Sequence, residues 1–160
     1  MGFPNDRTYS FDVNLQLADG AAAQTASGFA QVGGANGILD LGGNQGTTPQ
    51  QQARIDAVAV IDVSALKISA GNEAYRLSIL VSNDPAFGAG NVDMAAEISI
   101  GKGSARDGVN MKDSVVGRIE LPFCTQIGGV LYEYAALYVT EAGTSPSIQF
   151  SAFVAVIPEP

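Results

Sequence analysis

The chain has 160 residues, which is the size of one domain, and 46% of them are apolar, as in globular rather than disordered proteins. Its net charge of −8 argues against nucleic acid or an anionic membrane as a partner, because both require a basic surface. Histidine is absent, so the commonest general base and metal ligand are missing, and we expect no enzyme, no cofactor and no metal site.

The first third of the chain differs in composition from the rest. Residues 9–17 alternate apolar and polar side chains, which predicts a half-buried strand with Tyr9, Phe11, Val13, Leu15 and Leu17 on one face. Residues 33–52 are rich in Gly, Asn, Gln and Thr, and only the run from Ile38 to Leu41 is apolar. We interpret 1–52 as an N-terminal strand plus a Gly/Gln-rich arm or loop, part of the same domain as a β-sandwich core at 53–160.

Strand patterns become regular from residue 53 onward. Two-residue periodicity predicts strands over 53–66 and 75–82, and the first has apolar residues on both faces, which is typical of an interior strand. Residues 91–100 are either a strand or a short helix, and their apolar residues fit the two-residue period better. The polar loop over 101–114 carries Lys102, Arg106 and Lys112, three of only eight basic residues. We expect it to contact a partner.

The last third continues the pattern. Strands are predicted over 115–123, with Val115 inward, over 131–140 and over 147–156. Gly128-Gly129 predicts a hairpin turn between the first two. Alternation from 131 to 140 places Tyr132, Tyr134 and Tyr138 on one face, where they form either a protein interface, a carbohydrate platform or an ordinary sandwich face.

About eight short strands without a long amphipathic helix predict an all-β fold. We expect an antiparallel β-sandwich, jelly-roll-like, with a Gly-rich N-terminal arm or loop. The single cysteine, Cys124, lies in an apolar run, so a buried thiol is expected. A calcium site on the loop carboxylates of Asp84, Asp107 and Asp113 stays open, since calcium needs only oxygen ligands.

Several segments together resemble a known family. They are the strand-like runs 53–66 and 75–82, the Asp84-Pro85-Ala86-Phe87 turn, and the 142–148 segment that follows a tyrosine-rich strand. Over residues 9–156 the chain resembles the capsid cement, or decoration, proteins of tailed bacteriophages, of the type found in Bordetella phage. The resemblance implies a jelly roll that forms small oligomers on the outside of the shell, clamps neighbouring capsid subunits and has no catalytic residues.

The expected function is therefore that of a structural virion protein. Its partners would be the major capsid protein and further copies of itself as a dimer or trimer, with no nucleic acid and no membrane. It would be assembled in the host cytoplasm, consistent with an N-terminus that lacks the apolar segment of a signal peptide, and would lie on the outer capsid surface. The expected contact residues are Ile38, Leu41, Lys102, Arg106, Lys112, Tyr132, Tyr134 and Tyr138. The alternative is a carbohydrate-binding jelly-roll module or adhesin that uses the tyrosines as a platform.

Overall fold

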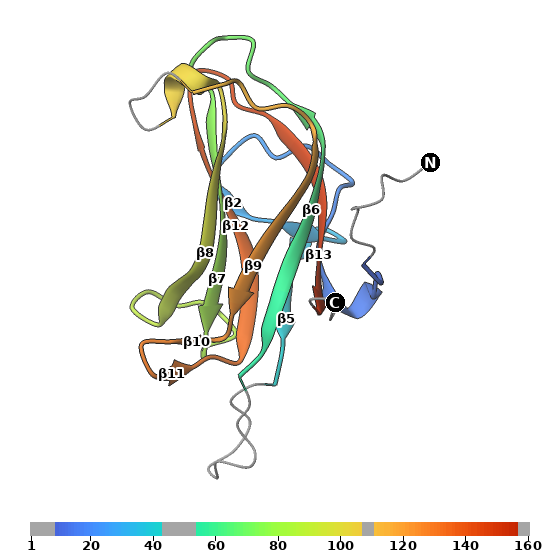
Figure 1. The fold of residues 1–160 in the computed structure, drawn as a ribbon, viewed down its shortest axis with the longest axis vertical. Helices are drawn as coiled ribbons and strands as arrows, with labels where there is room; N and C mark the ends of the chain where they lie inside the picture. Colours follow the sequence, from blue (N-terminus) through green and yellow to red (C-terminus); the bar gives the residue numbers. More distant parts are fainter. Residues whose placement is uncertain (1–8, 43–53, 107–110, 157–160) are drawn as a thin grey trace.

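The computed structural model describes residues 9–42, 54–106 and 111–156, which fold into two antiparallel β-sheets packed face to face (Figure 1). The all-β sandwich expected from the periodicity is confirmed. No helix in the described ranges is long and apolar enough to cross a membrane.

One sheet has four strands, in the order β1 (Gln16–Asp19), β13 (Ile148–Val156), β6 (Asp56–Leu66) and β9 (Gly117–Cys124). In the five-stranded sheet, β2 (Gly28–Phe29) and β5 (Ile38–Asp40) both pair with β12 (Tyr134–Ala142), which is followed by β7 (Ala74–Ser82) and β8 (Val92–Gly101). Small hairpins are formed by β3 (Gln31–Val32) with β4 (Ala35–Asn36) and by β10 (Gln126–Ile127) with β11 (Val130–Leu131). The described residues also include two 3-10 turns, η1 (Val13–Leu15) and η3 (Gly103–Ala105).

The main core lies between the sheets and is built by alternate residues of the long strands. Removing each large aliphatic side chain from water contributes about 1.5–3 kcal/mol. The fully buried members with large side chains include Leu17, Ile61, Tyr75, Leu77, Ile79, Val81, Leu137, Val139 and Ile148.

The Tyr75 side chain links the two sheets by hydrogen bonds at one end of the main core. Its hydroxyl lies 2.7 Å from the carbonyl oxygen of Lys67, just after β6, and accepts a hydrogen bond of 2.8 Å from the backbone N–H of Ser147, just before β13. The ring is completely buried in the five-stranded sheet. Because a buried hydroxyl without partners is costly, these bonds fix the ends of the two sheets relative to each other.

The outer face of the four-stranded sheet is covered by the N-terminal segment. Val58 and Val60 of β6 face away from the main core and form a second cluster with Phe153 and Ala155, against which Tyr9 packs. The ring centroids of Phe11 and Phe153 lie 5.3 Å apart, edge to face. Apolar residues on both faces of β6 thus reflect two packed surfaces.

The predicted strand over 9–17 is wrong except for its last two residues, which belong to β1. The Asp12 carboxylate accepts a hydrogen bond from the backbone N–H of Asn14, which caps η1 and breaks the extended chain. Phe11 and Val13 are 57% and 66% exposed, whereas Leu17, in β1, is buried in the main core and Leu15 packs against it, as predicted. The hydrogen bond of the Asp12 side chain therefore favours a turn, although the apolar residues alternate as they do in a strand.

The Gly-rich segment is part of the sandwich as far as it is described. Over 33–42 it forms the turn of the β3–β4 hairpin and strand β5, which pairs residue by residue with β12. The interpretation as an arm or loop is therefore wrong for strand β5, because β12 satisfies its backbone hydrogen bonds. Residues 43–52 lie outside the described ranges.

Two local predictions near β9 have opposite outcomes. The Gly128-Gly129 hairpin is confirmed, with φ of 57° and 82°, the positive values that a two-residue hairpin of this type requires. Val115, predicted inward, is 81% exposed because β9 begins only at Gly117.

Candidate functional site: an aromatic face on the five-stranded sheet

The outer face of the five-stranded sheet carries a row of apolar side chains across four strands. Pairing places Ile38 of β5 opposite Ala136 of β12, Ala136 opposite Leu80 of β7, and Leu80 opposite Met94 of β8. The residues before and after Leu80, Ile79 and Val81, face the main core. Because side chains alternate along a strand, the whole row points outward.

A parallel row brings aromatic rings to the same face. Phe29 of β2 is opposite Tyr138 of β12, and their ring centroids lie 5.1 Å apart, edge to face. Phe87, from the loop between β7 and β8, packs edge to face on Phe29 at 5.6 Å. We call the set Phe29, Ile38, Leu80, Phe87, Met94, Tyr134 and Tyr138 the aromatic face. Edge-to-face pairs contribute about 0.5–1.5 kcal/mol beyond their burial, so the rings hold one another in place.

The β7–β8 loop that carries Phe87 is held in an unusual conformation. Phe87 has a φ of 52°, the left-handed region that non-glycine residues rarely adopt. The Asp84 carboxylate accepts hydrogen bonds from the backbone N–H groups of Ala86 and Gly88, and these bonds, more than any other contact, lower the pKa of that carboxyl. The loop therefore folds back and presents the Phe87 ring to Phe29.

Part of the aromatic face stays open to solvent. Met94 is 50% exposed, Ile38, Leu80, Tyr134 and Tyr138 are half-buried, and Ala136 is fully buried. The charged side chains of this face are Asp40 at one end, beside Tyr134, and Arg76 at the other. Glu97 lies on the edge strand β8 in the row of Phe29 and Tyr138, with 3.8 Å between Arg76 Nε and Glu97 Oε1. The centre of the face is thus uncharged.

Three of the predicted contact residues, Ile38, Tyr134 and Tyr138, lie together on the aromatic face. Leu41 does not: it packs against the main core, and its backbone N–H donates to the carbonyl of Glu133 at 2.8 Å. Tyr134 keeps its hydroxyl proton, since burial first and then the carboxylates of Glu133 and Asp40 raise its pKa.

Tyr132 is not on a common face with the other tyrosines, and that prediction is wrong. The strand predicted over 131–140 is interrupted: β11 ends at Leu131 and β12 begins at Tyr134. Tyr132 packs against the main core and its hydroxyl donates to Asp93 at 3.3 Å. A flat platform of three tyrosines is therefore absent from the described residues.

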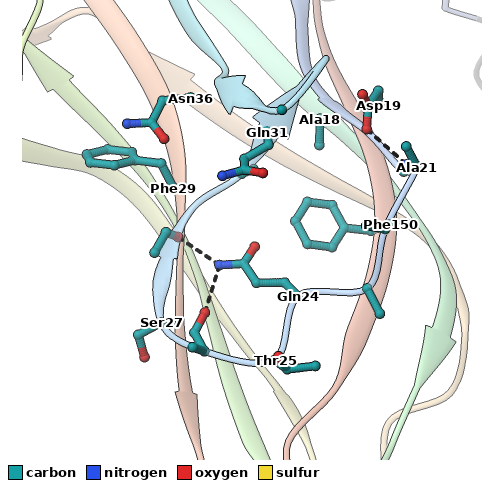
Figure 2. Close-up of a pocket in the computed structure, with 17 residues that line it drawn as sticks. Ala18, Asp19, Ala21, Gln24, Thr25, Ser27, Phe29, Gln31, Asn36 and Phe150 are labelled. Carbon is teal, nitrogen blue, oxygen red and sulfur yellow. Dashed lines mark hydrogen bonds between the residues drawn. The ribbon is translucent and has the colours of Figure 1, made fainter.

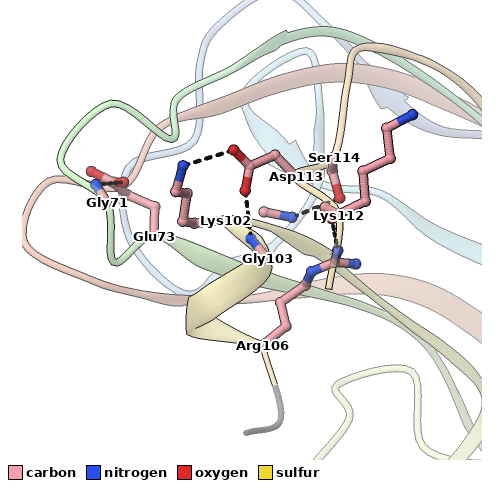
Figure 3. Close-up of polar contacts among 9 residues, drawn as sticks. Gly71, Glu73, Lys102, Gly103, Arg106, Lys112, Asp113 and Ser114 are labelled. Carbon is pink, nitrogen blue, oxygen red and sulfur yellow. Dashed lines mark hydrogen bonds and ion pairs between the residues drawn. The ribbon is translucent and has the colours of Figure 1, made fainter. Parts of the chain in front are cut away.

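Two of the three basic side chains in the predicted loop are bonded to groups of the chain itself (Figure 3). Lys102 Nζ lies 2.7 Å from the Asp113 carboxylate, which also accepts from the backbone N–H of Gly103. The guanidinium of Arg106 donates to the carbonyls of Ser99 and Lys112. Only the Lys112 side chain is exposed and, among the described residues, without a bonded partner.

A calcium site that joins Asp84 and Asp113 is ruled out by geometry. Asp84 precedes β8 and Asp113 follows it, so they lie at opposite ends of a ten-residue strand, about 33 Å apart at 3.3 Å per residue. Asp107 lies outside the described residues. Across the described ranges, no group of three or more Cys, Asp and Glu side chains could hold a metal ion.

Cys124 is half-buried rather than buried, because it is the last residue of the edge strand β9. Its thiol lies 3.1 Å from the carbonyl oxygen of Gln126.

Sequence reasoning missed Phe29, Leu80, Phe87 and Met94. Leu80 and Met94 belong to predicted strands, but the outward position of Met94 depends on an irregularity in β8, where Ala95 is an extra residue opposite the step from Ile79 to Leu80. Phe29 and Phe87 lie in segments without periodicity. The Asp84-Pro85 turn was the one signal that pointed to the loop.

Comparison with known proteins identifies no relative: no protein-family model, no curated protein and no solved structure matches the chain.

Proposed function

We propose that the chain is a structural virion protein, a capsid cement or decoration protein that binds the outside of a phage shell through its aromatic face. The observation that carries the proposal is the asymmetry of the sandwich. One outer face is covered by the chain's own N-terminal segment, whereas the other leaves the apolar row of Ile38, Leu80 and Met94 partly open. Exposed apolar surface with an uncharged centre is typical of protein-docking sites.

The strand order supports a jelly roll. To compare the strand order with that of a jelly roll, we number the eight sheet positions in chain order and count β2 and β5 as one position. The numbers 1 to 8 then stand for β1, β2/β5, β6, β7, β8, β9, β12 and β13. In this numbering the four-stranded sheet, β1-β13-β6-β9, has the order 1-8-3-6. The five-stranded sheet, β2-β12-β7-β8 with β5 beside β2, has the order 2-7-4-5. Two interleaved Greek keys give such an order in eight-stranded jelly rolls. The sequence resemblance to phage cement proteins adds the partner, the major capsid protein.

Many weak contacts suffice for such a role. A shell presents hundreds of equivalent sites, and an oligomeric cement protein engages several at once, so each additional contact multiplies the overall affinity. The proposal includes self-association as a dimer or trimer and a location on the outer capsid surface.

The test is co-sedimentation of the purified chain with undecorated shells of the phage that encodes it. We expect saturable binding at micromolar concentration, and at least a tenfold loss for Met94→Asp, which places a charge in the apolar row. Val115→Asp is the matched control, because Val115 is 81% exposed and lies outside the aromatic face. Absence of wild-type binding would reject the cement function; wild-type binding that Met94→Asp leaves unchanged would reject the face.

A further inference from the structure

A small pocket of about 240 Å³ lies at the Arg76 end of the outer face of the five-stranded sheet. Its lining includes one row of paired residues, Thr140 of β12, Arg76 of β7 and Ser99 of β8. Arg76 is an even number of residues from Leu80, so both side chains point outward. Arg106, which follows η3, also lines the pocket. The pocket is therefore on the same side of the sandwich as the aromatic face.

A larger cavity, of about 680 Å³, lies beside residues 18–31, with Phe29 in its lining (Figure 2). Asp19 is its one charged lining residue, and the carboxylate accepts hydrogen bonds from the backbone N–H groups of Ala21 at 2.9 Å and Gly33 at 2.7 Å. The lining of the small pocket has the opposite charge, because it includes two guanidinium groups and no carboxylate. Of the two cavities, only the small pocket is thus equipped to receive an anionic group.

The Arg106 guanidinium has no acidic partner among the described residues. It donates to two backbone carbonyls, that of Ser99 at 3.0 Å and that of Lys112 (Figure 3). Its Nε–H is buried and has no hydrogen-bond partner in the described ranges. Asp113, the acidic residue in the described part of this loop, is bonded to Lys102 at 2.7 Å instead. Arg106 is thus a half-buried cation, and burying a charge without an ion pair is costly.

Arg76 supplies the second guanidinium. Its Nε lies 3.8 Å from Glu97 Oε1, which is longer than the roughly 2.7–2.9 Å of a direct charge-assisted hydrogen bond. The other oxygen of Glu97 accepts from the Ser78 hydroxyl at 3.1 Å. Two guanidiniums and one carboxylate leave a surplus of one positive charge around the pocket, in a chain whose net charge is −8. This local surplus favours an acidic ligand.

The size and position of the pocket suit a single side chain of a docked protein. Small-molecule sites have volumes of about 300–1,000 Å³, more than this pocket offers. A guanidinium presents a planar set of N–H donors that matches a carboxylate, and Thr140 adds an exposed hydroxyl. Arg76 and Leu80 are four residues apart on β7, about 13 Å at 3.3 Å per residue. One partner surface of the usual size, about 800 Å², covers both.

We propose that this pocket receives the carboxylate of an Asp or Glu side chain on the protein against which the aromatic face docks. The inference rests on the proposed function and adds the chemistry of the partner: an apolar patch with an acidic residue about 13 Å from it. Arg76 and Arg106 donate to the carboxylate, while Leu80 and Met94 contact the apolar patch. Charged pairs of this kind determine orientation and association rate more than affinity, so the pocket fixes how the partner docks.

The first experiment measures co-sedimentation with undecorated shells at low and high salt, about 50 and 300 mM NaCl. Arg76→Gln should weaken binding at least fivefold at low salt, and its binding should depend less on salt than that of the wild type, because salt screens exposed charges. Arg54→Gln is the matched control. Arg54 and Arg76 side chains are both 52% exposed and both are paired with a carboxylate, but Arg54 precedes β6 of the four-stranded sheet. This control should bind like the wild type.

The second experiment needs no shell. The chain is titrated in NMR with two capped tripeptides, acetyl-Gly-Glu-Gly-amide and acetyl-Gly-Gln-Gly-amide, and with inorganic phosphate, all at millimolar concentration. We expect the Glu peptide to shift the backbone amides of 74–76, 99–106 and 140–142, and the Gln peptide to leave them unchanged. The shifts should be lost in Arg76→Gln and in Arg106→Gln. The melting temperature of Arg106→Gln is measured as well, because Arg106 also bonds two carbonyls; Arg76→Gln decides the result if that variant does not fold.

Four results overturn the carboxylate pocket. They are equal effects of Arg76→Gln and Arg54→Gln on shell binding, no shifts with the Glu peptide, shifts caused by phosphate or the Gln peptide instead, and self-association that is lost in Arg76→Gln, which would make a second copy the occupant. A chain that binds the Glu peptide but no shell would reject the cement function and keep the pocket. Shell binding that Arg76→Gln leaves unchanged would reject the pocket and keep the cement function.

Discussion

Glu141 provides a sharp test of how burial sets the pH dependence of stability. It lies in β12, paired with the fully buried Tyr75 of β7. Both carboxylate oxygens are inaccessible to solvent and have no hydrogen-bond partner in the described residues. Burial raises the pKa of Glu141 from 4.5 to about 7. We predict that Glu141→Gln stabilises the protein at alkaline pH and leaves it nearly unchanged at acidic pH.

The magnitude follows from linkage. Because the folded state holds the proton more tightly than the unfolded chain, the stability that comes from protonated Glu141 is complete below pH 4.5 and is lost as the pH rises to 7. A shift of about 2.5 pKa units corresponds to about 3.4 kcal/mol. The side chain is only partly buried, so solvent screening lowers the expected loss to about 1–2 kcal/mol.

Urea unfolding at pH 5 and pH 8 measures this difference directly. The free energy of unfolding of Glu141→Gln should exceed that of the wild type by about 1–2 kcal/mol at pH 8, and by clearly less at pH 5. Glu97→Gln makes the same change of net charge at an exposed position of β8 and is the control. The reasoning is refuted if Glu141→Gln gives the same difference at both pH values, or no more than Glu97→Gln gives.

Three further substitutions test the fold. Tyr75→Phe removes the hydroxyl that joins Lys67 to Ser147, and calorimetry should show a loss of about 1–2 kcal/mol; no loss would mean that the sheets do not depend on this link. Gly37→Ala would place a Cβ 2.1 Å from the carbonyl oxygen of Leu17, so a loss of about 2–3 kcal/mol in urea unfolding is expected, whereas a neutral result would show that β1 can move away. Asp62→Asn breaks the exposed pair with Arg118, 2.7 Å apart, and should cost less than about 1 kcal/mol in the same assay; a larger loss would contradict the view that solvent screens this pair.

The long strands could be predicted because each has a buried face of its own. The two-residue periods over 53–66, 75–82, 91–100 and 147–156 correspond to β6, β7, β8 and β13 within a few residues at each end. The dense apolar run of β6 also indicated, correctly, that both of its faces are covered.

The short strands could not be predicted because their partners, rather than their own side chains, define them. β2 and β5 together have five residues in Gly-rich surroundings, and they exist because β12 supplies their hydrogen bonds. Tyr132 and Tyr134 are two residues apart, yet the strand is interrupted before Tyr134, which no periodicity reveals.

Part of the candidate site could be predicted from the sequence. Ile38, Tyr134 and Tyr138 were expected as contact residues and do lie together, but the apolar row also depends on strand order and on the extra residue of β8, Ala95.

The N-terminal segment covers only the four-stranded sheet, and this has a practical consequence for protein engineering. Tyr9, at the start of the described chain, packs on the four-stranded sheet, and β13, at its end, is a strand of that sheet. A fluorescent or antigenic domain fused near either end would emerge from the layer opposite the aromatic face. The chain therefore suits use as a display scaffold, because the fused cargo would project away from whatever surface the aromatic face occupies.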